Sequence, residues 1–165
     1  TITVASAIEL GKINRYSRIN GTGKIKVGWW TIKNYDYARH PNPGMIDLVY
    51  LFEHSSNVAS VVVAQMMGRH EYYDMLKKFG FGEKTGIDLP VESLGYSGKS
   101  KLPGHLLDFS IGQYDTYTPI QLSQYINTIA NGGTRLRPYL LKEVYGPSAN
   151  PDDVLGELIY ANEKK

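Results

Sequence analysis

The feature that most constrains the fold is the stretch from Leu51 to Met67, "LFEHSSNVASVVVAQMM", in which a short polar run precedes a long apolar one. Apolar residues after Asn57 predict a helix from Ser56 to Gly68, and Met45 to His54 predicts another before it, with Ser55 at the joint. Hydroxyl and amide side chains at a helix start accept hydrogen bonds from the free amides of the first turn. The three polar residues are therefore either a helix cap or groups that face a substrate.

The residues before this joint predict one helix and one β element. Thr1 to Ile13 has apolar residues close to a 3.6-residue period, and Gly11 weakens the last turn of the helix that this predicts. From Asn14 to Asp36 the pattern becomes β-like, with an Asn20-Gly21 turn signal and alternating apolar residues from Ile25 to Trp29. This region therefore predicts a hairpin or a short sheet edge.

The residues after the joint predict further helices separated by loops. Glu71 to Phe79 predicts a third helix that Gly80 ends, and residues 79–104 are rich in Gly and Pro, which predicts loop. Thr118 followed by Pro119 is a good helix start, and that helix should end at Gly132-Gly133. Residues 134–146 are strand-like again. A helix-dominated chain with β pieces near both ends suits an α/β or α+β domain.

Composition excludes several classes of function. The chain has 165 residues and is 42% hydrophobic, enough for one ordinary core. Eighteen basic against sixteen acidic residues, without a dense basic stripe, gives no support to a nucleic-acid partner. No apolar stretch approaches the roughly 20 residues that span a bilayer. Cysteine is absent and the four histidines are far apart, so we predict no metal site.

Two chemical motifs can be set aside. Gly21-Thr22-Gly23-Lys24 resembles the end of a phosphate-binding loop, but Ile25 stands where the magnesium-binding Ser or Thr belongs and Arg18 where the upstream Gly belongs. A turn explains these residues better. Single carboxylates in different elements give no argument for an acid–base pair of the glycosidase type: Glu9, Asp47, Glu53 and Asp115.

The segment "FEHSSNVA" resembles the second active-site motif, Ser-x-Asn, of penicillin-binding proteins, which are serine acyl-transferases that share their fold with the serine β-lactamases. "TVASAIELGKI" resembles the helix after their nucleophile, and "KFGFGEKTGIDLPVE" the Gly-rich stretch that follows their Ser-x-Asn helices. "FSIGQYDTYTPIQLSQYINTIANGGTRLRPYLLKEV" resembles their later helix and strand lead-in. This order over nearly the whole chain is similar to that of monofunctional (class B) transpeptidases.

Two motifs of that family have no counterpart here. No Ser or Thr is followed three positions later by Lys, so the nucleophile motif Ser-x-x-Lys is expected upstream of Thr1. Lys84-Thr85-Gly86 spells the third motif but precedes the "IGQYDTYTP" segment, so we interpret it as a structural turn and expect the functional triplet beyond Lys165. We therefore expect residues 1–165 to be part of a single transpeptidase domain. The implied fold is the penicillin-binding/β-lactamase-like α/β (α+β) fold, mostly its helical part, with the central sheet incomplete.

The resemblance also implies an activity and a location. The intact protein would cross-link peptidoglycan, its serine attacking the penultimate D-Ala carbonyl of a stem peptide and passing the acyl group to another stem's amine, and β-lactams would acylate the same serine. No cofactor is implied, and the isolated segment should be inactive. Other cell-wall synthesis proteins would be partners. An upstream anchor would hold the protein at the extracytoplasmic face of a bacterial cell membrane, in division or cell-shape maintenance.

Site residues follow from the same resemblance. Ser55 would relay a proton between the nucleophile's lysine and the departing amine, and Asn57 would offer its amide to that lysine and to the substrate. Ser56, the variable middle position, should point elsewhere as the helix cap. Tyr114 and Tyr117, beside the Gly112-Gln113 turn, are candidates for the border of the substrate cleft.

Alternatives remain open at this point. A serine β-lactamase or a D,D-carboxypeptidase would share the fold, although the long "GEKTGIDLP" and "YTPIQLSQYINTIANGG" segments and the lack of a deacylating glutamate near Ser55 argue against a β-lactamase. A non-catalytic sensor or scaffold would keep the fold without the chemistry. Intact Ser55 and Asn57 weigh against that reading.

Overall fold

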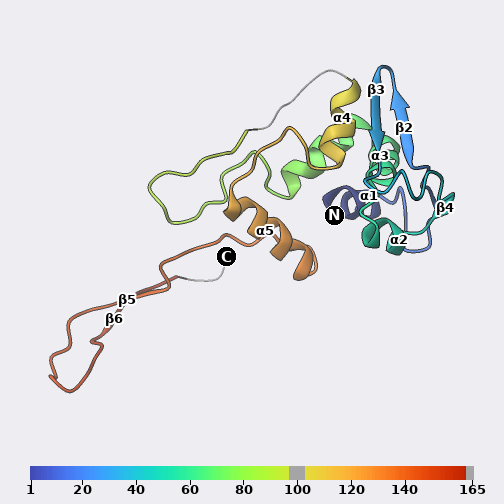
Figure 1. Cartoon of the computed structure of the whole chain (residues 1–165). Coiled ribbons are helices and arrows are strands. Elements are labelled where there is room, and N and C mark those ends of the chain that lie inside the picture. Colours follow the sequence, from blue (N-terminus) through green and yellow to red (C-terminus); the bar gives the residue numbers. More distant parts are fainter. Residues whose placement is uncertain (97–102, 163–165) are drawn as a thin grey trace. The chain divides into compact units, whose positions relative to one another are not determined.

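The computed structural model describes residues 1–96 and 103–162 (Figure 1). The chain forms two compact units: residues 1–78 with 96–116, and residues 79–95 with 117–165. Over the described residues it is mixed α/β, with three separate two-stranded sheets, each antiparallel. No helix in the described ranges is long and apolar enough to cross a membrane.

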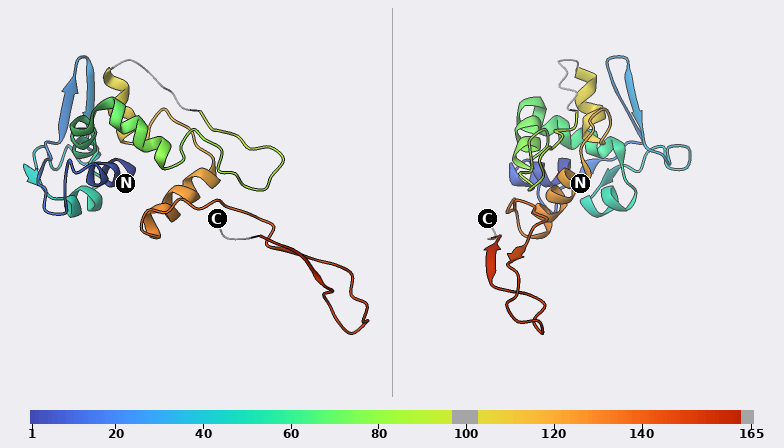
Figure 2. Two further views of the ribbon diagram at one scale, coloured as in Figure 1. Left: turned by 180° about the vertical axis from the view of Figure 1, so that it is seen from behind. Right: turned by 90° about the vertical axis from the view of Figure 1, so that its left-hand side faces the viewer.

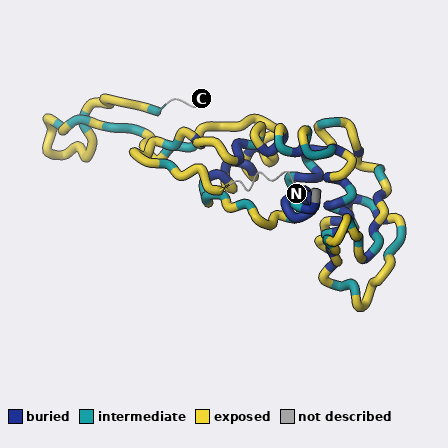
Figure 3. The backbone as a smooth tube through the Cα atoms, turned by 90° about the horizontal axis from the view of Figure 1, so that it is seen from above, coloured by how far each residue is buried: buried dark blue, intermediate teal, exposed yellow. Residues whose placement is uncertain are grey.

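The core of the first unit lies on α3 (Asn57–Lys78), which packs against α1 (Ile2–Glu9) and α4 (Pro103–Ser110). Figure 2 shows α3 beside both helices, and in Figure 3 the buried residues gather there. Small or β-branched side chains on α3 have no exposed surface and allow close helix approach: Ala59, Val61, Val63 and Ala64. The hydroxyl of Tyr72 donates to the carbonyl of Phe109 at 2.9 Å and joins α3 to α4.

A hairpin of β2 (Lys24–Val27) and β3 (Trp30–Lys33) covers this core, with Ile32 packing beside Val61 and Leu107. Its turn is at Gly28, where φ is +61°, and Trp29 there is 85% exposed. The expectation of a turn at Asn20-Gly21 was therefore wrong for the hairpin, and Trp29 is outside the alternating strand.

Gly21 has a different role. It lies beside the pairing of β1 (Ile19–Asn20) with β4 (Met45–Ile46), and a Cβ on Gly21 would come within 2.7 Å of the side chain of Ile46. A residue without a side chain is needed there because two chain segments meet closely. The Asn20 side chain still makes a local turn, since its Oδ1 accepts from the amide of Thr22 at 3.0 Å.

The two helices around the joint form, with changed boundaries. Met45-Ile46 is a strand rather than helix, so α2 is shorter than predicted (Leu48–Glu53) and begins after Asp47, whose carboxylate accepts the amide of Tyr50 at 2.8 Å. The predicted second and third helices are one element, α3, interrupted at Gly68 with φ 74° and ψ 171°. The expected end at Gly80 is confirmed, with φ +88°. Helix α4 was not predicted, because its start lies in the Gly/Pro-rich stretch expected to be loop.

The second unit is organised around α5 (Pro119–Ala130), which begins as predicted. Thr118 Oγ1 accepts the amide of Gln121 at 3.3 Å, and Gln121 Oε1 accepts the amide of Thr118 at 2.9 Å, a reciprocal capping box. Gln121, only 1% exposed, also donates through Nε2 to the carbonyls of Glu83 and Leu94 and holds the preceding loop. Gly132, at φ +84°, follows the helix end.

The last elements form an exposed hairpin of β5 (Glu143–Tyr145) and β6 (Leu158–Ala161) (Figure 3). Only three residues of the strand-like stretch 134–146 are in a regular strand. The chain before β5 is held by Asp88, whose carboxylate accepts the amides of Leu140 and Leu141 at 2.7 and 2.8 Å. These two hydrogen bonds lower the pKa of Asp88 because they stabilise its charged form.

Candidate active site

The joint between α2 and α3 places Ser55 in a left-handed conformation, with φ +46°. The amide of Ser56 donates to the carbonyl of Leu51 at 2.9 Å and that of Ser55 to the carbonyl of Phe52 at 3.2 Å. This is the Schellman pattern that ends a helix, with Ser55 at the position where Gly is usual. A non-glycine residue there costs on the order of 1–2 kcal/mol, and such strain is a reason to look for function.

Ser55 and Ser56 have different surroundings. Ser55 is exposed, and no hydrogen bond joins its hydroxyl to another residue of the described ranges. Ser56 is 2% exposed, and its Oγ accepts the amide of Ala59 at 3.2 Å while donating to Asn34 Oδ1 at 3.3 Å. The prediction that Ser56 caps the helix is confirmed.

A clamp from the end of β3 fixes the first turn of α3. Asn34 Oδ1 accepts the amide of Val58 at 3.0 Å, and Asn57 Nδ2 donates to the carbonyl of Lys33 at 3.1 Å. Asn34 is 6% exposed, so its carbonyl oxygen replaces water for an amide that is itself buried. Sequence reasoning missed Asn34. The signal was an amide residue two positions after Ile32, on the strand's inward register.

His54 packs on the other side of the joint. Its ring stacks on Tyr50 with centroids 3.9 Å apart and an angle of 15°, and its Nδ1 lies 3.8 Å from Asp36 Oδ2. These contacts connect α2 to the loop after β3. The result is a rigid strand–helix junction that presents one free hydroxyl, Ser55, beside an anchored amide, Asn57.

The family described as penicillin binding protein transpeptidase domain matches residues 1–164 of this chain. The chain belongs to the penicillin-binding transpeptidase family. Penicillin-binding protein 2A of Bacillus subtilis (strain 168) is 47% identical over 66% of this chain, and PbpB of Mycolicibacterium smegmatis is 32% identical over 88%. The chain spans only 17% and 22% of those two relatives.

Solved structures of this family share the fold. Penicillin-binding protein 2B of Streptococcus pneumoniae (strain 5204) superposes with a TM-score of 0.84 at 30% identity, over 99% of this chain and 30% of that one. A peptidoglycan synthetase from Bifidobacterium adolescentis gives a TM-score of 0.80 at 26% identity, over 99% and 29%. The resemblance to class B penicillin-binding proteins and the fold class with an incomplete sheet are both confirmed.

The two tyrosine candidates of this transpeptidase segment belong to different units. Tyr114, at φ +70° and 59% exposed, stacks on His105 in the first unit with centroids 5.4 Å apart. Tyr117 lies in the second unit, with its ring 4.2 Å from that of Phe81. Their place at the border of a cleft stays a prediction for each tyrosine separately.

The Lys84-Thr85-Gly86 triplet lies in a loop, as its interpretation as a turn requires. The carboxylate of Glu92 accepts the amides of Thr85, at 2.5 Å, and of Gly86, at 3.1 Å. Desolvation works to raise the pKa of Glu92, but hydrogen bonds from the side chain and amide of Thr85 and from the amide of Gly86, with the charge of Lys84, outweigh it, and the net shift of the pKa is downward. Because the amides of Thr85 and Gly86 are both bound by the Glu92 carboxylate, the triplet has a structural role in the loop.

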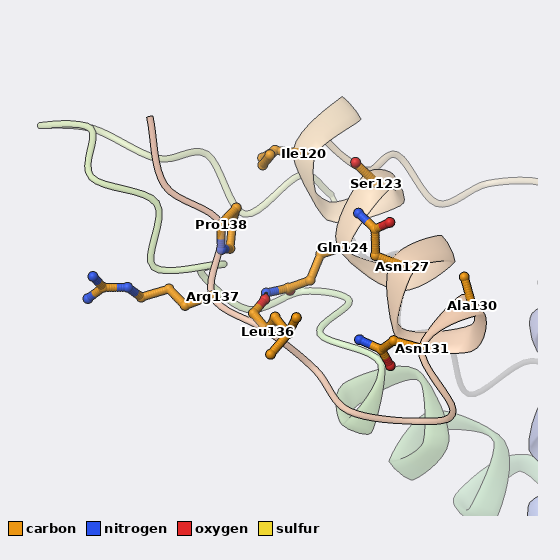
Figure 4. A pocket seen from close by; sticks show the side chains of 9 residues that line it. All are labelled: Ile120, Ser123, Gln124, Asn127, Ala130, Asn131, Leu136, Arg137 and Pro138. Atoms are coloured by element: carbon orange, nitrogen blue, oxygen red, sulfur yellow. The ribbon is translucent and has the colours of Figure 1, made fainter. Parts of the chain in front are cut away.

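The second unit has a cavity of about 310 Å³ between α5 and the segment after it (Figure 4). Its wall includes Ser123, Asn127 and Arg137, and the side chain of Gln124 crosses to the carbonyl of Leu136 at 2.8 Å. None of the predicted site residues lines it. Within the described ranges, no group of three or more His, Asp or Glu residues could hold a metal ion.

Proposed function

We propose that the protein that contains this chain is a serine D,D-transpeptidase that cross-links peptidoglycan stem peptides through an acyl-enzyme. Residues 1–165 are then part of one transpeptidase domain, with the Ser-x-x-Lys motif upstream of Thr1 and the Lys-Thr/Ser-Gly motif downstream of Lys165. Family membership supports this assignment, and the exposed, strained Ser55 beside an anchored Asn57 is the observation that carries it.

In this proposal Ser55 relays a proton. Its hydroxyl can both donate and accept, so it can take a proton from the lysine of the nucleophile motif and give it to the departing amine of D-Ala. No described side chain competes for that hydroxyl. The left-handed backbone holds it at the joint rather than in the helix.

Asn57 orients the reactants. One N–H of its amide is used by the carbonyl of Lys33, which fixes the plane of the group. The second N–H and the oxygen remain for the nucleophile's lysine and for the substrate's peptide group. Pre-oriented polar groups of this kind reduce the entropy that the reaction must lose at the transition state.

The remaining parts of the proposal concern the whole protein. Stem peptides and β-lactams would bind at the same serine, other cell-wall synthesis proteins would be partners, and a membrane anchor outside this chain would place the domain on the extracytoplasmic face. The isolated segment would be inactive because nucleophile, general base and oxyanion-binding strand lie outside it.

The test is labelling of the full-length protein and of the 165-residue chain with a fluorescent penicillin, followed by peptide mapping of the labelled serine. We expect the full-length protein to label at a serine upstream of Thr1 and the chain not to label. Labelling of a serine within residues 1–165 would overturn the placement of the nucleophile. A full-length protein that never labels would favour a non-catalytic sensor or scaffold of the same fold.

A further inference from the structure

The outward face of the β2–β3 hairpin carries a concentration of positive charge. Lys24 lies directly opposite Lys33 and Lys26 opposite Thr31, while the alternate residues turn inward to the core. All three lysines are exposed. We call Lys24, Lys26 and Lys33 the lysine face; Figure 1 shows the hairpin that carries it projecting from the helices of its unit.

This charge is not neutralised within the described part of the chain. None of the three ammonium groups pairs with a carboxylate there, although other lysines such as Lys12 and Lys142 do. Like charges directly opposite each other in an antiparallel pair are destabilising, because their Cβ atoms lie only about 5 Å apart. A structural role would favour one acidic partner in this pair, so the arrangement points to an anion from outside.

The ring of Tyr37 organises two of the lysines. Lys24 Nζ lies 5.6 Å and Lys33 Nζ 5.4 Å from its centroid, so both ammonium groups are drawn to the same ring by a cation–π interaction. The ring itself is fixed, since it packs so closely on Gly23 that a Cβ there would lie 2.8 Å from Tyr37 Cδ2. Because Lys24 and Lys33 are directly opposite each other in the strand pairing, their two side chains can reach a single carboxylate together.

We propose that the lysine face binds carboxylate groups of peptidoglycan, as a docking site in addition to the candidate active site. This inference rests on the proposed function for the identity of the polymer. The Lys24–Lys33 pair is at the end of the hairpin nearest the site, because the carbonyl of Lys33 accepts the amide of Asn57. A polymer held there is close to the strand–helix junction that carries Ser55.

A membrane surface fits this face less well. Elements that lie on a bilayer combine basic residues with an apolar face that enters the lipid. Between the lysines the outward face offers only Thr31, and the apolar residues of both strands are turned to the core. Trp29 is exposed but lies at the tip. Discrete, hydrated carboxylates on a soluble polymer match such a face.

The experiment measures binding of the full-length protein to purified peptidoglycan sacculi, freed of other anionic polymers, and to the same sacculi with their carboxylates amidated. We expect the Lys24→Gln/Lys33→Gln variant to bind unmodified sacculi roughly five- to tenfold more weakly, the loss of two exposed ionic contacts. Amidation should reduce wild-type binding to the level of this variant. Lys78→Gln/Lys142→Gln, with the same change of charge, and Tyr37→Phe, which keeps the ring, should bind like wild type.

Equal binding by wild type and the Lys24/Lys33 variant, or wild-type binding that survives amidation, would overturn the inference. If the Lys24→Gln/Lys33→Gln variant loses binding to phosphatidylglycerol vesicles while its binding to sacculi is unchanged, the inference is overturned in favour of a lipid surface. Penicillin labelling separates the two proposals. If penicillin labels the full-length protein normally but its binding to sacculi does not depend on these lysines, only the docking site is contradicted. If penicillin never labels the protein but its binding to sacculi needs these lysines, only the transpeptidase assignment is contradicted.

Discussion

Replacing Asn34 by Ala tests the clamp that holds the first turn of α3. The change removes the acceptor of the Val58 amide, which is in a residue only 1% exposed, and one partner of Ser56 Oγ. An unpaired buried donor costs about 1–3 kcal/mol, and loss of a helix cap about 0.5–2 kcal/mol. Both ranges describe the loss of the same hydrogen bond and are therefore not added. We expect the free energy of unfolding to fall by about 2 kcal/mol.

Hydrogen exchange of the full-length protein measures this loss where it occurs. Since 1.4 kcal/mol is a factor of ten, about 2 kcal/mol predicts roughly thirtyfold faster exchange of the Val58 amide. Penicillin acylation should fall as well, because the loosened turn carries Asn57. Asn34→Asp keeps an acceptor and should restore protection.

A matched control is Asn42→Ala, which removes an exposed acceptor 3.3 Å from the amide of Gly44. Exposed substitutions of this kind change stability by less than about 0.5 kcal/mol. If Asn34→Ala leaves the exchange of Val58 within the range of this control, the clamp does not hold the turn and our reasoning about the junction is wrong.

Three further predictions concern stability, and thermal unfolding of the full-length protein measures each. Gly104→Ala places a Cβ 2.8 Å from Trp30 Cδ2 and should destabilise by about 1–3 kcal/mol through overpacking, whereas Gly146→Ala, whose nearest contact is 3.4 Å, should be close to neutral. Thr118→Ala removes half of the capping box and should cost about 1 kcal/mol, with Thr118→Ser close to wild type. Burial raises the pKa of Asp108, so the folded state holds the Asp108 proton more tightly than the unfolded state does, and stability falls as pH rises above the ordinary aspartate range. Asp108→Asn should therefore be stabilised relative to wild type by more at pH 7 than at pH 4. An equal stabilisation at both pH values would refute this.

Elements decided by local hydrogen bonds could be predicted from the sequence. The start of α5 at Thr118-Pro119, the cap by Ser56 and the end of α3 before Gly80 each depend on a few neighbouring residues. The Ser-x-Asn motif also predicted different roles for Ser55 and Ser56. The structure confirms the role of Ser56 as the helix cap.

Features decided by residues far apart in the chain could not be predicted. Met45 is helix-compatible, but it pairs with Asn20 as a strand, and Asn34 reaches Val58 across 24 positions. Gly21 looked like a turn residue because its partner, Ile46, could not be known. Such contacts require the tertiary structure, which overrides local preference.

The central claim is that Ser55 faces the substrate while Ser56 caps the helix. The most direct test compares the rates at which penicillin acylates the Ser55→Gly and Ser56→Ala variants of the full-length protein, together with the thermal unfolding temperature of each variant. Glycine relieves the left-handed strain at Ser55, so we predict that Ser55→Gly unfolds at an equal or higher temperature but is acylated far more slowly. Ser56→Ala should unfold earlier and, while folded, acylate close to the wild-type rate. The opposite pattern, with acylation retained in Ser55→Gly and lost in folded Ser56→Ala, would contradict the assignment of Ser55 to the substrate and Ser56 to the helix.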